Sequence, residues 1–212
     1  MLTHNGYVHY GCGLKAPESW TNFDASPTPR LQKIPVVGTV VSRSRPTFPA
    51  GIHFGDIVKG LPIERGSCEA IYCSHVLEHL SLNDFRIALA NTLGALKPGG
   101  VFRCVLPDLE TLARAYLASD SDRPAEWFMR NTYLGFENRP KGLAGMAREW
   151  LGNSRHLWMW DERTLSTELR AAGFTEIRRA SFGDSAEPKF AEVEEISRWT
   201  GCLGMECRRP SV

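Results

Sequence analysis

The sequence predicts one α/β domain built on a doubly wound, mostly parallel sheet with a helical insertion. Three observations lead to this fold class. Short apolar runs with strand character alternate with segments of helical periodicity. Glycine or aspartate follows each of the first three runs, as at the carboxyl ends of strands in open parallel sheets. The chain has 212 residues, 42% of them hydrophobic, which suits a single domain with its own core.

The N-terminal quarter of the chain contains three candidate strands, at residues 7–10, 21–24 and 52–56. The first ends at a pair of glycines, and the second and third each end in an aspartate. Residues 30–50 contain three prolines, which interrupt regular structure, and residues 36–41 suggest an edge strand or a hairpin.

The middle of the chain predicts a strand, a helix and a second strand in succession. Residues 69–74 are apolar enough for a buried strand. Ser81 begins a helix, because Asp84 stands at the spacing of a capping box and leucines recur at helical intervals. Residues 97–100 (Lys-Pro-Gly-Gly) end that helix, and residues 101–106 form the next strand.

The remainder predicts a helical insertion followed by the last elements of the sheet. Residues 109–160 are mostly helical and longer than a simple crossover, within one domain that spans residues 1–212. Asp161 begins a further helix that ends at Gly173, and residues 174–177 and 202–207 form strands. Strands that alternate with helices in this way indicate a Rossmann-like sheet.

Four of the six tryptophans lie in the insertion, at Trp127, Trp150, Trp158 and Trp160. Two interpretations of this block stand side by side. It is a lid that packs onto the domain, or it forms an aromatic-lined pocket for a flat ring or a sugar face.

The charge balance and the cysteines limit the classes of partner. With 25 basic and 24 acidic side chains, the formal charge is +1. This small excess of basic residues does not suit binding to a phosphate backbone, so we expect no nucleic-acid partner. No signal peptide and no apolar run of 18 residues occurs, so we expect no membrane partner. The six cysteines include no CxxC pair, which indicates reduced thiols in a cytoplasmic protein. We expect a monomer or a homodimer, in which the tryptophan-rich surface could form the interface.

Three features in the first half of the chain share one chemical logic: the pair Gly11 and Gly13, Asp24, and Asp56. Each follows a predicted strand, and the carboxyl ends of parallel strands meet at one edge of the sheet. Glycines let a backbone approach a ligand closely, and carboxylates accept hydrogen bonds from ribose hydroxyls. The series therefore predicts a site for a nucleoside cofactor.

Several motifs then follow one another in a characteristic order, at residues 8–13 (Val-His-Tyr-Gly-Cys-Gly), 22–24 (Asn-Phe-Asp), 55–57 (Gly-Asp-Ile), 74–80 (Ser-His-Val-Leu-Glu-His-Leu), 96–101 (Leu-Lys-Pro-Gly-Gly-Val) and 172–174 (Ala-Gly-Phe). In these motifs the sequence resembles the class I S-adenosylmethionine-dependent methyltransferases, in particular the small "type 11" group. The resemblance implies S-adenosylmethionine as cofactor and methyl transfer to a small-molecule or sugar-like acceptor, with O-methylation favoured.

The resemblance also implies roles for individual residues. Gly11, Cys12 and Gly13 would line the methionine part of the cofactor, and Asp24 would bind the ribose diol. The adenine would meet Asp56 and Ile57. At the end of the fourth strand, Ser74 and His75 would lie beside the methionine part and the transferable methyl group.

The chain departs from the family pattern at the first glycines. His9 replaces the acidic residue that usually stands two positions before Gly11, and no third glycine follows Gly13. Only residues 14–21 separate Gly13 from the next strand, too few for the usual crossover helix, so we expect a loop. A dinucleotide needs a helix N-terminus for its pyrophosphate, which favours S-adenosylmethionine over NAD.

A hydroxyl acceptor needs a base near the methyl group, and four residues are candidates by position: His75, His79, Asp108 and His156. A carboxylate acceptor needs none.

Residues 75–79 also match H-x-x-E-H, a zinc-protease motif that carries both histidines on one long helix. The strand that ends at Ser74 and the helix that begins at Ser81 leave room for one or two turns only, so we expect no metal. His79 is then a partly buried histidine near the rim of the cofactor site. An alternative function is a non-catalytic relative that binds a nucleoside or a partner protein.

Overall fold

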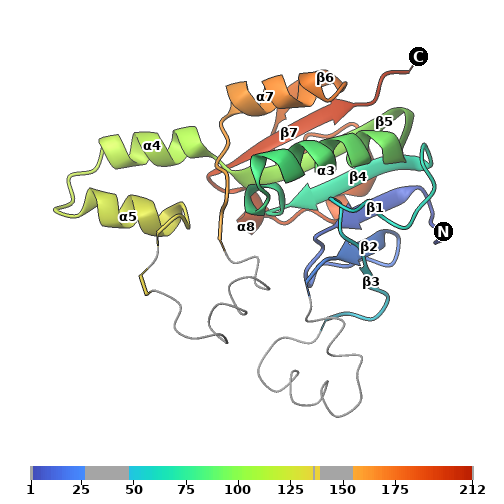
Figure 1. Ribbon diagram of the computed structural model, residues 1–212, viewed down its shortest axis with the longest axis horizontal. Helices are drawn as coiled ribbons and strands as arrows, with labels where there is room; N and C mark the ends of the chain where they lie inside the picture. The colour runs from blue at the N-terminus through green and yellow to red at the C-terminus, as the bar shows by residue number, and fades with distance from the viewer. Residues whose placement is uncertain (1, 27–47, 136, 139–154, 212) are drawn as a thin grey trace, which may run out of the picture.

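The computed structural model describes residues 2–26, 48–135, 137–138 and 155–211 (Figure 1). It contains a seven-stranded sheet in the order β3-β2-β1-β4-β5-β7-β6. The strands are β1 (Tyr7–Tyr10), β2 (Thr21–Asp24), β3 (His53–Phe54), β4 (Cys68–Ser74), β5 (Leu96–Pro107), β6 (Thr175–Ala180) and β7 (Cys202–Arg208).

The sheet is mostly parallel, as the sequence predicts. Neighbouring strands from β3 to β5 run parallel, and β7 is antiparallel to both β5 and β6. The chain moves outward from β1 to β3 and then returns to place β4 on the other side of β1. The strand order therefore reverses between β1 and β4, which is where open α/β sheets bind their ligands.

Helices α3 (Leu82–Ala95) and α7 (Glu162–Ala171) cover one face of the sheet (Figure 1). Both begin as predicted: Ser81 Oγ accepts a hydrogen bond from Asp84 N, and Asp161 Oδ1 accepts one from Thr164 N. The left-handed φ of 102° at Gly173 ends the second helix. Apolar side chains of both helices join the strands in one core, which explains their periodic leucines.

The opposite face is covered by the segment between β6 and β7, which the sequence left unassigned. It contains a 3-10 helix, η2 (Pro188–Glu192), and the short helix α8 (Ile196–Trp199). Phe190, Val193 and Trp199 pack there against Tyr72 and Val105. This packing brings α8 close to the end of β4.

A buried arginine fastens that segment to the sheet. Arg103 of β5 is fully buried, and its guanidinium donates to Glu194 Oε1 (2.5 Å), Glu206 Oε2 (2.9 Å) and Asp184 Oδ1 (3.0 Å). The same group lies 4.5 Å from the ring centroid of Trp199. One side chain thus connects β5 to two residues of the β6–β7 connection, Asp184 and Glu194, and to Glu206 of β7.

Three predicted strands clearly differ in length in the structure. The strand expected at residues 101–106 is β5, which already begins at Leu96 and includes residues 97–100. The third candidate strand, 52–56, is reduced to His53–Phe54, because a turn begins at Asp56, where Lys59 N donates to Asp56 O (3.1 Å). The sixth strand extends to Ala180, since Arg178, Arg179 and Ala180 pair with β7. The hairpin expected at residues 36–41 lies outside the described residues.

The described part of the insertion forms a helical hairpin of α4 (Leu109–Leu117) and α5 (Pro124–Asn131), which projects from the edge of the sheet (Figure 1). The two helices pack together, with the rings of Tyr116 and Phe128 5.5 Å apart. Trp160 differs from the other tryptophans of this block. It is fully buried in the core, 4.1 Å from the ring of Phe85. Trp150 lies outside the described residues.

The connection between β1 and β2 confirms the expected loop. Residues 11–20 are all described and form turns without a helix. Among the described helices, none combines the length and the apolar character needed to span a bilayer.

Candidate functional site

The glycine turn after β1 lies against the segment that follows β4. Gly11 and Gly13 have left-handed φ values of 65° and 54°. A Cβ on Gly11 would stand only 2.1 Å from Cγ2 of Val76, so no side chain fits at this position. A Cβ on Gly13 would meet no atom within 4 Å. At Gly11 the turn therefore packs tightly against the segment after β4, whereas the space beside Gly13 is free of protein atoms and available to a ligand.

Asp24 stands at the end of β2 with both carboxylate oxygens oriented by backbone amides. Gly13 N donates to Oδ2 over 3.1 Å, and Ser26 N donates to Oδ1 over 2.8 Å. The side chain retains 9% exposure. Asp24 thus joins the glycine turn to β2 and presents its remaining lone pairs at the carboxyl edge.

Asp56 and Ile57 follow β3 at the same edge of the sheet. Asp56 Oδ1 accepts a hydrogen bond from Val58 N over 3.0 Å, and Oδ2 forms an ion pair with Lys59. The Ile57 side chain is buried in the core. Only the half-buried Asp56 side chain and the neighbouring backbone are available to a ligand here.

Two buried polar atoms mark the inner end of this edge. Ser74 Oγ and His9 Nδ1 have no hydrogen-bond partner among the described residues, although both side chains are buried. Burial lowers the pKa of His9 to about 3, so its ring is neutral at the position where the family carries an acid. Buried polar atoms without partners are uncommon, and a polar ligand supplies such partners. The residues at this edge fit a nucleoside cofactor.

Cys12, between the two glycines, is a buried thiol. Burial, together with the nearby charge of Asp24, raises the pKa of Cys12 to about 12. The protonated thiol is a poor nucleophile. Its contribution at this edge is its backbone.

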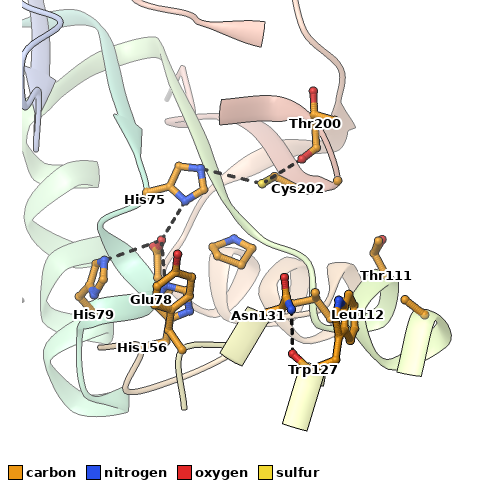
Figure 2. A pocket seen from close by; sticks show the side chains of 14 residues that line it. His75, Glu78, His79, Thr111, Leu112, Trp127, Asn131, His156, Thr200 and Cys202 are labelled. Atoms are coloured by element: carbon orange, nitrogen blue, oxygen red, sulfur yellow. Dashed lines mark hydrogen bonds and ion pairs between the residues drawn. The ribbon is translucent and has the colours of Figure 1, made fainter. Parts of the chain in front are cut away.

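Three of the four predicted base candidates meet in space around one acid (Figure 2). Glu78 Oε1 lies 3.2 Å from His75 Nδ1, 4.0 Å from His79 Nε2 and 4.0 Å from His156 Nε2. The rings of His79 and His156 are 5.1 Å apart. Glu78 and His79 belong to the 3-10 helix η1 (Leu77–His79), whereas His156 comes from the segment before α7. We call these four residues the histidine cluster.

His75 joins β4 to the histidine cluster in a strained backbone conformation, with φ 55°. Its amide donates to Val105 O over 2.8 Å, and Nε2 lies 3.0 Å from Arg198 O. Burial opposes a charge on the ring, but contacts with Cys202 and with the Glu78 carboxylate outweigh it and raise the pKa of His75 to about 10.

A cavity of about 590 Å³ opens beside the histidine cluster. Its walls come from the segment after β4 with η1, from the end of β5, from α4 and α5, and from the start of β7 (Figure 2). The polar cluster lies on one side, and the other walls are largely apolar, including Pro107, Leu112, Ala115, Trp127 and Tyr133.

The fourth base candidate, Asp108, has a different role. Its Oδ1 caps α4 by accepting a hydrogen bond from Glu110 N (3.0 Å), and its Oδ2 pairs with Arg179 Nη2 (2.8 Å). The side chain is 2% exposed and does not line the cavity. We correct the expectation for Asp108: it is a helix cap, because the strand that ends before it leads directly into α4.

Sequence reasoning missed several residues of the site. Glu78 appeared only as part of the protease motif, although an acid within a run of apolar residues is itself a signal of a buried charge. Arg198, whose Nη2 donates to Ser74 O over 3.2 Å, and Cys202 reach the site through α8 and β7. Arg198 and Cys202 lie near Ser74 and His75 only because of how the β6–β7 connection packs, and no sequence motif predicts that packing.

The protease motif does not form its helix. His75 precedes η1, which spans only Leu77–His79, so the two histidines of the motif do not share a helical face. This agrees with the short connection expected between Ser74 and Ser81.

The fold recurs in solved methyltransferases. A methyltransferase from Haloferax volcanii, solved with the Trm112 methyltransferase activator, has a TM-score of 0.50 at 18% identity, with 96% of this chain and 82% of that chain covered. An S-adenosylmethionine-dependent methyltransferase from Thermotoga maritima has a TM-score of 0.52 at 15% identity, with coverage of 99% and 84%. PigF, solved with SAH, has a TM-score of 0.50 at 14% identity, with coverage of 97% and 50%.

Sequence comparison supports the same assignment. No curated protein sequence matches the chain. The family described as methyltransferase domain, however, matches residues 11–178, which include the glycine turn, both aspartates and the histidine cluster. This match favours an enzyme over a non-catalytic binding protein. The chain belongs to the methyltransferase domain family and is a class I S-adenosylmethionine-dependent methyltransferase.

Proposed function

We propose that this methyltransferase transfers the methyl group of S-adenosylmethionine to an oxygen atom of a small-molecule acceptor. One observation carries the proposal: a cavity of about 590 Å³ borders His75, immediately after the strand whose end faces the cofactor edge. Donor and acceptor sites then share the segment that contains Ser74, His75 and Val76. Val76 in turn contacts the glycine turn at Gly11.

The cofactor would occupy the edge formed by β1, β2 and β3, where it supplies an electrophilic methyl group on a sulfonium. In this proposal the backbone from Gly11 through Cys12 to Gly13 borders the methionine part. Asp24 accepts hydrogen bonds from the ribose hydroxyls, as its exposed lone pairs allow. The adenine lies against Asp56 and Ile57, and Ser74 Oγ and the His75 backbone border the methyl group.

The cavity favours a small acceptor. Its volume falls in the range of about 300–1,000 Å³ that is usual for small-molecule sites. Trp127 and Tyr133 offer aromatic surface for a ring or a sugar face. The near-neutral charge of the chain gives no support to a nucleic-acid acceptor.

Oxygen is favoured as the acceptor atom because His156 of the histidine cluster, whose pKa is lowered by burial, is a proton-accepting group that lines the cavity. A hydroxyl must lose its proton as it attacks, and positioned imidazole or carboxylate groups assist that loss. The remaining task of the protein is alignment of the two reactants and exclusion of water, for which the apolar walls and the α4–α5 hairpin are suited.

An acceptor screen tests the proposal. Purified protein is incubated with S-adenosylmethionine and, separately, with phenols and sugars, with carboxylic acids, and with amines, and S-adenosylhomocysteine is measured by mass spectrometry against a blank without acceptor. Turnover with hydroxyl compounds is expected. The Thermotoga maritima protein is described as a possible histamine N-methyltransferase, and turnover restricted to amines here would overturn O-methylation.

The setting of the enzyme is part of the same proposal. All six cysteines are free thiols and five of them are buried, which supports a reducing, cytoplasmic compartment. We expect a monomer or a homodimer, and light scattering after size-exclusion chromatography measures which of the two is present.

A further inference from the structure

The carboxylate of Glu78 is fully buried, and its ion pair with His75 is its shortest contact with an imidazole. Its side chain has no exposed surface, and neither oxygen has a hydrogen-bond partner in the described part of the chain. The groups around it are three imidazoles, of His75, His79 and His156. A charged carboxylate is costly to bury unless a cation or several hydrogen bonds neutralise it. His75 supplies one cation, 3.2 Å from Oε1, whereas the ring nitrogens of His79 and His156 lie 4.0 Å from the same oxygen and leave space for an ion between them and the carboxylate.

His79 is held in the tautomer that metal sites use. Its Nδ1 lies 2.7 Å from the carbonyl oxygen of Arg155, so this nitrogen must carry the proton and donate it. The lone pair of Nε2 is then directed toward Glu78 (Figure 2). Metal-binding histidines characteristically donate their second ring nitrogen to a backbone carbonyl in this way, which fixes both the ring and the tautomer.

His156 is brought to Glu78 by defined backbone contacts. Leu157 N and Trp158 N both donate to the carbonyl oxygen of Glu78, over 2.7 and 3.2 Å. His156 itself is 8% exposed. The two segments are thus fastened together directly beside the three donor atoms.

We propose that Glu78, His79 and His156 bind one divalent transition-metal ion. One donor atom from each of the three lies within 4.8 Å of the other two. Ligands at roughly 2.1 Å from an ion stand about 3–3.5 Å apart, so binding draws these side chains together by around 1 Å. Two imidazole nitrogens and one carboxylate oxygen suit Zn²⁺, Mn²⁺ or Co²⁺ better than Ca²⁺ or Mg²⁺, which prefer oxygen.

Three protein ligands leave coordination positions open toward the cavity. Sites that keep a position open are typical of catalytic metals, whereas structural sites are closed. The binding of the ion rests on the geometry alone, and its role rests on the proposed function. An acceptor hydroxyl bound to the ion loses its proton more readily, as metal-bound water does. In the overall reaction a carbon–oxygen bond forms, the carbon–sulfur bond of the donor breaks, and the hydroxyl proton is released to water.

Co²⁺ titration of metal-free, untagged protein tests the site. We expect one equivalent of Co²⁺ to bind with visible absorption bands, and Zn²⁺ to displace it. His79→Ala and His156→Ala should weaken Co²⁺ binding at least tenfold, and the near-isosteric Glu78→Gln should weaken it similarly. His53→Ala, on the far edge strand β3, is the matched control and should bind like the unaltered protein.

Thermal unfolding followed by circular dichroism verifies that each variant is folded, and calorimetry measures S-adenosylmethionine binding separately. Absence of Co²⁺ bands, or equal Co²⁺ affinity in His79→Ala and unaltered protein, overturns the metal site. Stoichiometric Co²⁺ binding without methyl transfer to any hydroxyl supports the metal site and overturns the proposed function. Hydroxyl methylation that is unchanged in EDTA supports the proposed function and overturns the role of the ion in that reaction.

Discussion

The backbone amide of Gly13 donates a hydrogen bond to Oδ2 of Asp24 over 3.1 Å. This contact joins the turn after β1 to the end of β2, although no helix forms between the two strands. In place of a crossover helix, the carboxylate holds the glycine turn at the edge of the sheet. The short connection therefore still brings together the two features that the cofactor requires.

Replacement of Asp24 by alanine should weaken binding of S-adenosylmethionine. The variant loses charge-assisted hydrogen bonds to the ribose and also frees the glycine turn. Such bonds contribute about 1.5–3 kcal/mol, which corresponds to a 10- to 150-fold increase in Kd. Asp24→Asn keeps an acceptor for Gly13 N but loses the charge. Its Kd for S-adenosylmethionine should therefore lie between those of the unaltered protein and Asp24→Ala. Calorimetric titration measures all three proteins, and an unchanged Kd in Asp24→Ala would remove Asp24 from the site.

Gly11→Ala should both destabilise the fold and abolish tight cofactor binding. The new Cβ would stand 2.1 Å from Val76 Cγ2, in addition to a left-handed backbone that costs about 1–2 kcal/mol for other residues. Gly13→Ala has the same backbone cost without the clash, so it should lose less stability in urea unfolding.

The clash predicts a specific rescue. Val76→Ala removes the obstructing methyl group, so Gly11→Ala combined with Val76→Ala should be more stable than the sum of the single changes predicts. Strict additivity in this double-mutant cycle would show that the contact between the turn and the segment after β4 does not limit position 11.

Trp127→Ala should raise KM for the acceptor and leave Kd for S-adenosylmethionine unchanged. Trp127 lines the cavity from α5, away from the cofactor edge. The loss of one aromatic contact of about 0.5–1.5 kcal/mol corresponds to a two- to tenfold change. Trp158, comparably exposed but outside the cavity lining, is the matched control. Equal effects of Trp127→Ala and Trp158→Ala on KM would contradict an acceptor site in this cavity.

Arg103→Met should destabilise the protein strongly, because the buried Glu194 and its neighbours Glu206 and Asp184 would lose their common partner. Removal of one member of a buried ion pair costs about 3–5 kcal/mol. Arg178 pairs with Asp184 and Glu206 nearer the surface, with 39% of its side chain exposed, and Arg178→Ala should cost at most about 1 kcal/mol. Urea unfolding compares the two, and similar losses would show that the buried position of Arg103 is unimportant.

Contacts between residues close in the sequence allowed the helix ends and the order of strands and helices to be predicted. Ser81 and Asp161 cap their helices through a side chain and an amide three residues away, a contact that needs no tertiary structure. Gly173 ends α7 because of its own left-handed backbone. The alternation of strands and helices, with glycine and aspartate at the strand ends, likewise follows from short-range pattern, and it determined the parallel sheet and the cofactor edge.

Tertiary structure decided what depends on contacts between distant segments. Trp160 is a core residue and Trp127 a cavity residue, although both belong to the same tryptophan-rich block. Asp108 became a cap because α4 begins directly after β5. The packing of α8 placed Arg198 at the end of β4, and no sequence period encodes that contact.

The histidine cluster shows the same division. Adjacent positions in the chain place Glu78 beside His79, and the motif made both visible. His156 joins them only because backbone hydrogen bonds fasten its segment to Glu78. Residue types and spacing along the chain therefore determined the fold class and the cofactor. The convergence of three imidazoles on one buried carboxylate required the folded chain, because the distance between side chains depends on packing and not on their separation in sequence.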